Sequence, residues 1–126
     1  MPIFEIRALP QKPGVNHQAA MKRLCCEIAT IMKISERQVW ATWAPILPGD
    51  YLEGGNSANI QPDSTHPPIV NLVAFEGRPE SLIEKVINQA AVILCEELKI
   101  ETGNVYIQFT ETKSGRTYVG GELRRK

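Results

Sequence analysis

The chain has 126 residues, of which 43% are apolar, and its 14 basic and 14 acidic side chains balance to a formal net charge of zero. This length allows one domain or two very small ones, and the lack of net basic charge argues against a nucleic-acid-binding protein. No apolar run is long enough to span a membrane, and the first residues lack the layout of a signal peptide, so we expect a cytoplasmic protein.

The cysteines give no sign of a disulfide framework or a metal site. Cys25, Cys26 and Cys95 are odd in number, and no C-x-x-C spacing is present. We expect them to be small buried hydrophobic side chains in helices; a catalytic thiol would need a base that neither His17 nor His66 is positioned in sequence to supply. Because no phosphate-binding glycine motif is present either, we expect neither a metal nor a cofactor.

The first half of the chain reads as strand, helix and strand. The segment PIFEIRAL (residues 2–9) is predicted to be a strand, and a helix is predicted after Asn16, a suitable N-cap. QVWATWA (38–44) is predicted to be the second strand, and the pair Gly54-Gly55 follows it, where the chain can turn into a short extra strand. The apolar spacing that predicts the helix is that of Ala20, Leu24, Ile28 and Ile31 or Met32.

A loop over residues 56–67, rich in Ser, Asn, Asp and Pro, leads to a second half with the same order. PIVNLVAF (68–75) and NVYIQFT (104–110) are predicted strands, and residues 82–98 between them carry apolar side chains at helical spacing. A second glycine pair, Gly120-Gly121, follows the last strand.

The two halves are related by a shift of 66 residues, which places Pro2-Ile3 on Pro68-Ile69 and Trp40 on Tyr106. The identical positions fall at strand starts, turns and glycine pairs, where backbone geometry restricts the choice of residue. We therefore expect one domain over residues 1–126, made of repeat 2–55 and repeat 68–123 joined by loop 56–67.

Each repeat favours two parallel strands with a helical crossover, so the expected fold class is α+β, with a four-stranded sheet and two helices on one face. The other face would carry Trp40, Tyr106, Phe4 or Ile3, and Val70 or Val73, and the chain has no third layer to cover it. Self-association is the simplest way to cover this face.

The second repeat resembles the oxalocrotonate tautomerase type of the tautomerase superfamily. The resemblance rests on P-I, then E-G-R, a helix, V-x-I-x-F-T-E and a terminal G-G-E-L. Across both repeats the layout is similar to fused members of that superfamily, including the macrophage migration inhibitory factor, haloacrylate dehalogenase and malonate semialdehyde decarboxylase types. The resemblance implies a homotrimer that acts on a small molecule, either a carboxylate or an aromatic enol.

The resemblance implies that Pro2 is the catalytic residue, exposed by removal of Met1. Its free nitrogen would be a rigid secondary amine, and an apolar pocket near cations would favour its neutral, basic form. With a high pKa it would instead be an acid. Pro68 is preceded by Pro67 and has an amide nitrogen, so we expect one proline site per chain.

Five further residues are candidate substrate-binding residues by resemblance. Arg78 in E-G-R corresponds to an arginine near the substrate carboxylate, and a guanidinium suits a planar carboxylate. Tyr106 and Gln108 are possible donors to an oxyanion, and Trp40 would make the pocket aromatic. Lys33 resembles a lysine at the end of the first helix of the inhibitory-factor type, although its repeat at Lys99 favours helix capping.

Two departures from the family pattern bear on the substrate. Tyr106 and Trp40 stand where the oxalocrotonate type has a second arginine, and Phe75 replaces an arginine of the dehalogenase type. Both departures argue against a dicarboxylate substrate and against dehalogenation, although Arg7 or Arg116 could restore a cation. The C-terminal RRK is expected to be a solvated terminus.

We therefore expect a cofactor-independent tautomerase that interconverts the keto and enol forms of a small carbonyl acid. A dehalogenase, hydratase or decarboxylase of the same superfamily is an alternative, as is a non-catalytic trimeric scaffold or signalling protein.

Overall fold

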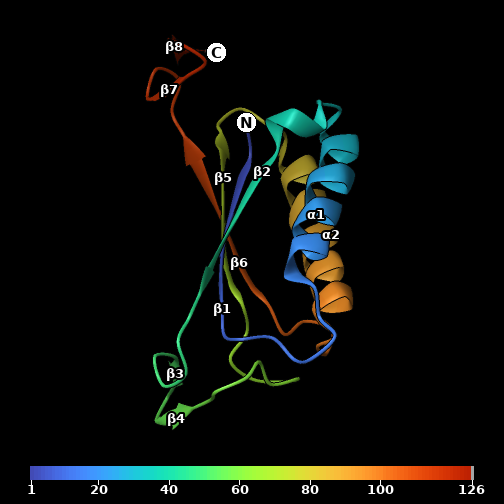
Figure 1. The fold of residues 1–126 in the computed structure, drawn as a ribbon. Helices are drawn as coiled ribbons and strands as arrows, with labels where there is room; N and C mark the ends of the chain where they lie inside the picture. The colour runs from blue at the N-terminus through green and yellow to red at the C-terminus, as the bar shows by residue number, and fades with distance from the viewer. Residues whose placement is uncertain (126) are drawn as a thin grey trace.

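The computed structural model describes residues 1–125, in which two halves repeat the same order of elements (Figure 1). The first half contains β1 (Ile3–Ala8), α1 (His17–Met32), the 3-10 helix η1 (Glu36–Gln38), β2 (Trp40–Pro45), β3 (Leu52–Glu53) and β4 (Asn56–Ser57). The second half contains β5 (Ile69–Phe75), α2 (Glu80–Leu98), β6 (Tyr106–Thr112), β7 (Thr117–Val119) and β8 (Glu122–Arg124).

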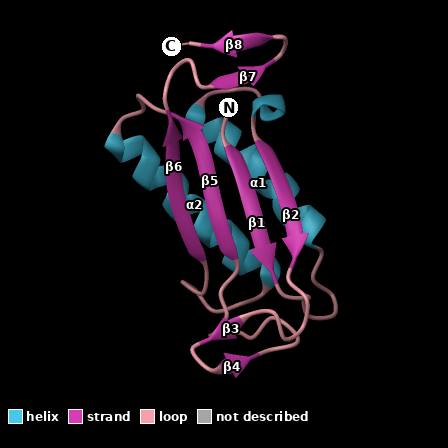
Figure 2. Ribbon diagram, turned by 90° about the vertical axis from the view of Figure 1, so that its left-hand side faces the viewer, coloured by secondary structure: helices cyan, strands magenta, loops and turns pink. Residues whose placement is uncertain are grey.

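The main sheet has the strand order β2-β1-β5-β6, and both helices cover one of its faces (Figure 2). β1 and β2 are parallel, β5 and β6 are parallel, and β1 and β5 are antiparallel. The predicted fold class is thus confirmed. Glu5 lies directly opposite Asn71, and these residues occupy equivalent positions of the two repeats. An approximate twofold axis therefore passes between β1 and β5, and it relates one end of the sheet to the other.

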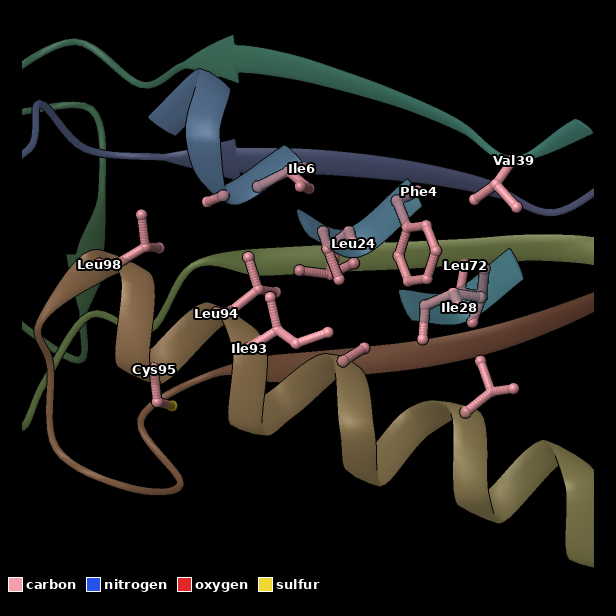
Figure 3. Close-up of a cluster of buried hydrophobic side chains, with 14 of the residues drawn as sticks. Phe4, Ile6, Leu24, Ile28, Val39, Leu72, Ile93, Leu94, Cys95 and Leu98 are labelled. Atoms are coloured by element: carbon pink, nitrogen blue, oxygen red, sulfur yellow. The ribbon is translucent and has the colours of Figure 1, made fainter. Parts of the chain in front are cut away.

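The hydrophobic core lies between the sheet and the two helices (Figure 3). Phe4 and Leu72 point into it from the two central strands and are fully buried, as the alternation of side chains along a strand requires. α1 contributes Leu24 and Ile28, and α2 contributes Ile93 among others. Each such side chain stabilises the fold by roughly 1.5–3 kcal/mol through burial alone.

The helix ends follow local rules that repeat between the halves. Asn16 is the N-cap of α1, and its Oδ1 accepts a hydrogen bond from Ala19 N at 3.2 Å, as predicted. Lys33 and Lys99 end the two helices in the left-handed conformation, with φ of 58° and 57°. The backbone at these lysines, rather than their charge, thus ends each helix.

The face of the sheet away from the helices is open in the single chain. Of the alternatives left by the sequence, Ile3 and Val73 lie on this open face, whereas Phe4 and Val70 are in the core. Trp40 is 41% exposed. The centre of the open face is polar, since Asn71 Nδ2 donates to Glu5 Oε1 at 3.1 Å.

The expectation that all three cysteines are buried needs correction. Cys95 is buried and Cys25 is half-buried, but Cys26 is exposed, because it lies on the solvent side of α1. The loop over residues 56–67 begins with the short strand β4 and contains two buried polar residues, Gln61 and His66. No helix within residues 1–125 has the length and apolar character needed to cross a membrane.

Candidate active site at the N-terminus

A cavity of about 250 Å³ lies at the N-terminus of the chain. We call it the N-terminal cavity; it is lined by Met1, Ile34, Gln38, Phe75, Arg78, Val119 and Arg124. A second hollow of about 240 Å³ adjoins it and shares Met1, Phe75 and Val119 with it. Ile3, Trp40, Val73 and Tyr118 also line this apolar hollow. The first residue of the chain therefore separates a cationic space from an apolar one.

The main chain holds Pro2 at this position. Pro2 is buried, and its carbonyl oxygen accepts a hydrogen bond from Trp40 N at 3.0 Å. Since β1 runs antiparallel to β5, the start of β1 lies near the end of β5, where Ile3 pairs with Val73. This pairing brings the N-terminus to Phe75 and to Arg78, which follow along the chain.

Arg78 is one of the residues that line the N-terminal cavity. Its Nη1 donates to the carbonyl oxygen of Phe75 at 3.0 Å, which fixes the guanidinium at the end of β5. Burial lowers the pKa of Arg78, and the carboxylate of Glu111 opposes this effect. The group still carries its charge at neutral pH, because an arginine side chain loses its proton only in strongly alkaline solution.

A second guanidinium, that of Arg124, lines the same cavity. The expectation that RRK is a solvated terminus is wrong for this residue, because Arg124 belongs to β8 and is only partly exposed. Figure 2 shows the β7–β8 hairpin folded beside the N-terminus. Lys126, the last residue of RRK, lies outside the described residues. The glycine pair in VGGELR predicts the hairpin, but nothing local in sequence predicts what the hairpin packs against.

The positive charges of Arg78 and Arg124 both act on the terminal amine. Burial lowers the pKa of the Met1 α-amine below its ordinary value of 8.0, and the positive charges of Arg78 and Arg124 lower it further. A protonated amine is disfavoured in this place because it loses hydration and is repelled by two like charges.

Trp40 and Lys33 lie at the same end of the molecule. Trp40 lines the apolar hollow beside Met1, and its Nε1 donates to Arg37 O at 3.0 Å. The Lys33 side chain is exposed, and its neighbour Ile34 is the residue that lines the N-terminal cavity. Gln38, which the sequence analysis did not single out, also lines the cavity, while its Oε1 accepts from Ser35 N at the start of η1.

Tyr106 lies toward the opposite end of the open face, and Gln108 lies near its centre, where it pairs with Asn71. Tyr106 pairs with Ile69, four residues along β5 from Val73, the partner of Ile3. At about 3.3 Å per residue, the Tyr106 position is roughly 13 Å from the start of β1. The Tyr106 hydroxyl donates to Gln108 Oε1 at 3.3 Å. Within one chain, these two candidates are not brought to the N-terminal cavity.

The position equivalent to the N-terminal cavity in the other half is filled by the chain itself. Lys12, the counterpart of Arg78, donates to a carboxylate oxygen of Asp63 and to the carbonyl oxygen of Lys99. Asn104, the counterpart of Gln38, donates through Nδ2 to backbone oxygens of the same loop, including Thr65 O at 3.1 Å. The loop between the repeats therefore closes one of two related positions, and only the N-terminal one is open.

Within residues 1–125, no group of three or more His, Cys, Asp or Glu side chains is arranged to hold a metal ion. No protein-family model matches the chain, and no curated protein matches it.

Solved structures match the chain over nearly its whole length. A native fused 4-OT covers 96% of this chain and 94% of its own, with a TM-score of 0.82 and 14% identity. N1, a member of the cis-3-chloroacrylic acid dehalogenase family, covers 98% and 84%, with a TM-score of 0.79 and 13% identity. The chain has the tautomerase fold. A macrophage migration inhibitory factor-like protein from Entamoeba histolytica shares this tautomerase fold, with a TM-score of 0.69 and 13% identity over 94% of each chain.

Proposed function

We propose that this protein is a cofactor-independent tautomerase that interconverts keto and enol forms of a small carbonyl acid, with Pro2 as general base after removal of Met1. The observation that supports it is the place of the terminal amine, in a partly apolar cavity beside Arg78 and Arg124. The tautomerase fold makes enzymatic activity the expected function. The cavity provides the two groups that the reaction needs, an amine that can take up a proton and cations that can bind a carboxylate.

The reaction needs one group that takes up a proton and returns it. After loss of Met1, the Pro2 nitrogen is a secondary amine in the same surroundings that disfavour protonation of the Met1 amine. The neutral amine accepts the proton of the enol hydroxyl, and the resulting ammonium donates a proton to carbon as the carbonyl forms. No proton is gained or lost overall, and Arg78 holds the substrate carboxylate in place.

The lowered pKa of the terminal amine favours this reaction over hydration or dehalogenation. Those alternatives need the amine as a proton donor, and the surroundings favour its neutral form. Because the structure is similar to that of N1, hydration and dehalogenation are also measured in the assay.

We also propose a homotrimer, in which the open face of each sheet is covered by other copies. Two similar structures are fused 4-OT trimers, one symmetric and one asymmetric. In such an assembly, Tyr106 and Gln108 would reach a cavity only from a neighbouring copy, because they lie far from Pro2 in their own chain.

The test combines intact mass with kinetics. If the mature protein lacks Met1, ketonisation of phenylpyruvate and hydroxymuconate enols is measured for the wild type and for Pro2→Ala. General acid–base catalysis contributes about 10²–10⁴-fold, so Pro2→Ala should lose activity by that factor. Equal rates would remove Pro2 from the mechanism. A mature protein that keeps Met1 would support the non-catalytic scaffold, and turnover of chloroacrylate or malonate semialdehyde would support the alternative reactions.

A further inference from the structure

The β7–β8 hairpin places Arg124 at the N-terminal cavity. Its tip is a two-residue turn at Gly120-Gly121, both with positive φ, which joins Val119 to Glu122. Thr117 pairs with Arg124, and the Arg124 carbonyl oxygen accepts a hydrogen bond from Gly115 N at 2.7 Å. The backbone of Arg124 is thus fixed by bonds that do not involve its side chain.

The guanidinium of Arg124 makes few interactions with the rest of the described residues. Its Nε is buried and has no hydrogen-bond partner among residues 1–125. Its Nη1 is 3.4 Å from Glu122 Oε1, and the Glu122 side chain is 67% exposed, so this ion pair is weak. A Cβ at Gly120 would lie 3.0 Å from Arg124 Nη2, so the bare glycine leaves room for the group.

The N-terminal cavity consequently holds two cations that are only weakly neutralised, by the exposed Glu122 at Arg124 and by Glu111, which acts on Arg78 from beyond salt-bridge distance. Arg78 donates to a carbonyl oxygen and has no carboxylate within salt-bridge distance among the described residues. Both guanidinium groups are close enough to the terminal amine to lower its pKa. A substrate with one carboxylate would neutralise one of the two guanidinium groups. The other guanidinium would stay partly buried without a hydrogen-bond acceptor.

From this arrangement we infer that Arg124 is a specificity-determining residue that binds a second negatively charged oxygen of the substrate, in addition to the carboxylate held by Arg78. The inference rests on the proposed function only for the nature of the substrate. The second oxygen is either that of a second carboxylate or that of the enolate formed during proton transfer. The departures at Phe75 and Tyr106 removed a second cation, and Arg124, rather than Arg7 or Arg116, supplies it at the N-terminal cavity.

The first experiment measures binding without turnover. Calorimetric affinities of propionate and succinate are compared for the wild type, Arg124→Gln, Arg124→Lys and Arg116→Gln. Arg116 is a matched control because it is exposed one residue before β7, is not among the residues that line the N-terminal cavity or the apolar hollow, and changes the net charge equally when lost. If the second oxygen is a carboxylate, the wild type binds succinate at least about tenfold more tightly than propionate. Arg124→Gln abolishes this preference, Arg124→Lys retains part of it and Arg116→Gln keeps it.

The second experiment covers the enolate. If the wild type shows no preference for succinate, Arg124→Gln should lower kcat on a monocarboxylate enol at least about tenfold with KM nearly unchanged, because the contact is made only as charge develops. Circular dichroism of each variant checks that the hairpin and sheet are retained. Behaviour of Arg124→Gln equal to that of Arg116→Gln in both experiments would overturn the inference.

The two proposals fail independently. A wild type that turns over no enol but binds succinate in an Arg124-dependent way would reject the tautomerase and keep the role of Arg124. An active enzyme whose succinate binding and kcat are unaffected by Arg124→Gln would keep the tautomerase and reject the role of Arg124.

Discussion

Lys12 holds the carboxylate of Asp63 at the position that corresponds, in the other half of the chain, to the open cavity at Arg78. The loop that connects the repeats thus places an acidic group of the protein where the related cavity is free to receive one from a ligand. The relation explains what duplication achieves here: one of two equivalent positions is closed and stabilises the fold, and the other is free for chemistry. It also shows that a cation at this position of the repeat is suited to a carboxylate.

The first prediction compares these two cations. Arg78→Gln should raise KM for a carbonyl acid at least about tenfold, because a charge-assisted hydrogen bond contributes about 1.5–3 kcal/mol. Lys12→Gln should leave KM unchanged and lower the free energy of unfolding by about 1 kcal/mol, since the pair with Asp63 is partly exposed. Steady-state kinetics and urea denaturation measure the two effects. The reverse pattern, in which Lys12→Gln changes KM and Arg78→Gln only stability, would show that the wrong half had been assigned as the site.

The second prediction concerns the pH dependence of the terminal amine. In protein prepared with Met1 retained, the α-amine should titrate below its ordinary value of 8.0, because burial and the charges of Arg78 and Arg124 disfavour the ammonium form. A lowered pKa means that the neutral form persists to lower pH. Removing either cation should raise the pKa, as measured by ¹⁵N NMR of the labelled amine, whereas Arg116→Gln should not.

The same sign applies to catalysis by Pro2. The base form increases as pH rises through the amine pKa, so kcat/KM should rise with pH and then level off. Arg78→Gln should move this rise to higher pH. A rate that falls as pH increases through the same range would mean that the protonated amine is the active form, as the dehalogenase or hydratase alternative requires.

The features that could be predicted from sequence are those set by local periodicity. Alternation along β1 and β5 and helical spacing in α2 predicted the layers, and Asn16 predicted the start of α1, because each signal lies within one element. Arg78 was proposed by resemblance alone, and its place near the N-terminus follows from the pairing of β5 with β1, because Arg78 lies three residues beyond the end of β5.

The rest depends on packing between segments that are far apart in sequence. No sequence periodicity predicts that Arg124 lies near Met1. The composition of residues 56–67 likewise does not predict that Asp63 forms an ion pair with Lys12. Tyr106 and Gln108 were grouped with Pro2 by resemblance, but the parallel pairing of β5 with β6 places Tyr106 at the far end of the sheet. The sequence pattern does not predict which copy in an assembly contributes Tyr106 and Gln108 to a given cavity.

The third prediction separates the backbone of Lys33 from its side chain. Lys33 ends α1 with φ of 58°, a conformation that glycine adopts without strain. Lys33→Gly should therefore raise the free energy of unfolding by about 0.5–1 kcal/mol, whereas Lys33→Ala should not. Chemical denaturation of the two variants measures this difference.

Kinetics of these two variants then test the side chain. Because the Lys33 side chain is exposed and Ile34 lines the cavity instead, we expect both variants to keep kcat and KM within about twofold, less than the loss of one substrate hydrogen bond would cause. A tenfold or greater loss shared by both would establish the lysine as a substrate contact.

The fourth prediction concerns the open face of the sheet. Ile69 is half-buried there, next to Tyr106 on β6 and opposite Arg7 on β1. If other copies cover this face, Ile69→Lys would bury an unpaired charge, and the trimer should dissociate to monomers in sedimentation velocity experiments. Val92→Lys is the control, because Val92 is exposed on the outer side of α2 and the same change there should leave the trimer intact. A wild type that sediments as a monomer, or a trimer that tolerates lysine at residue 69, would place the interface elsewhere and leave Tyr106 and Gln108 without a route to any N-terminal cavity.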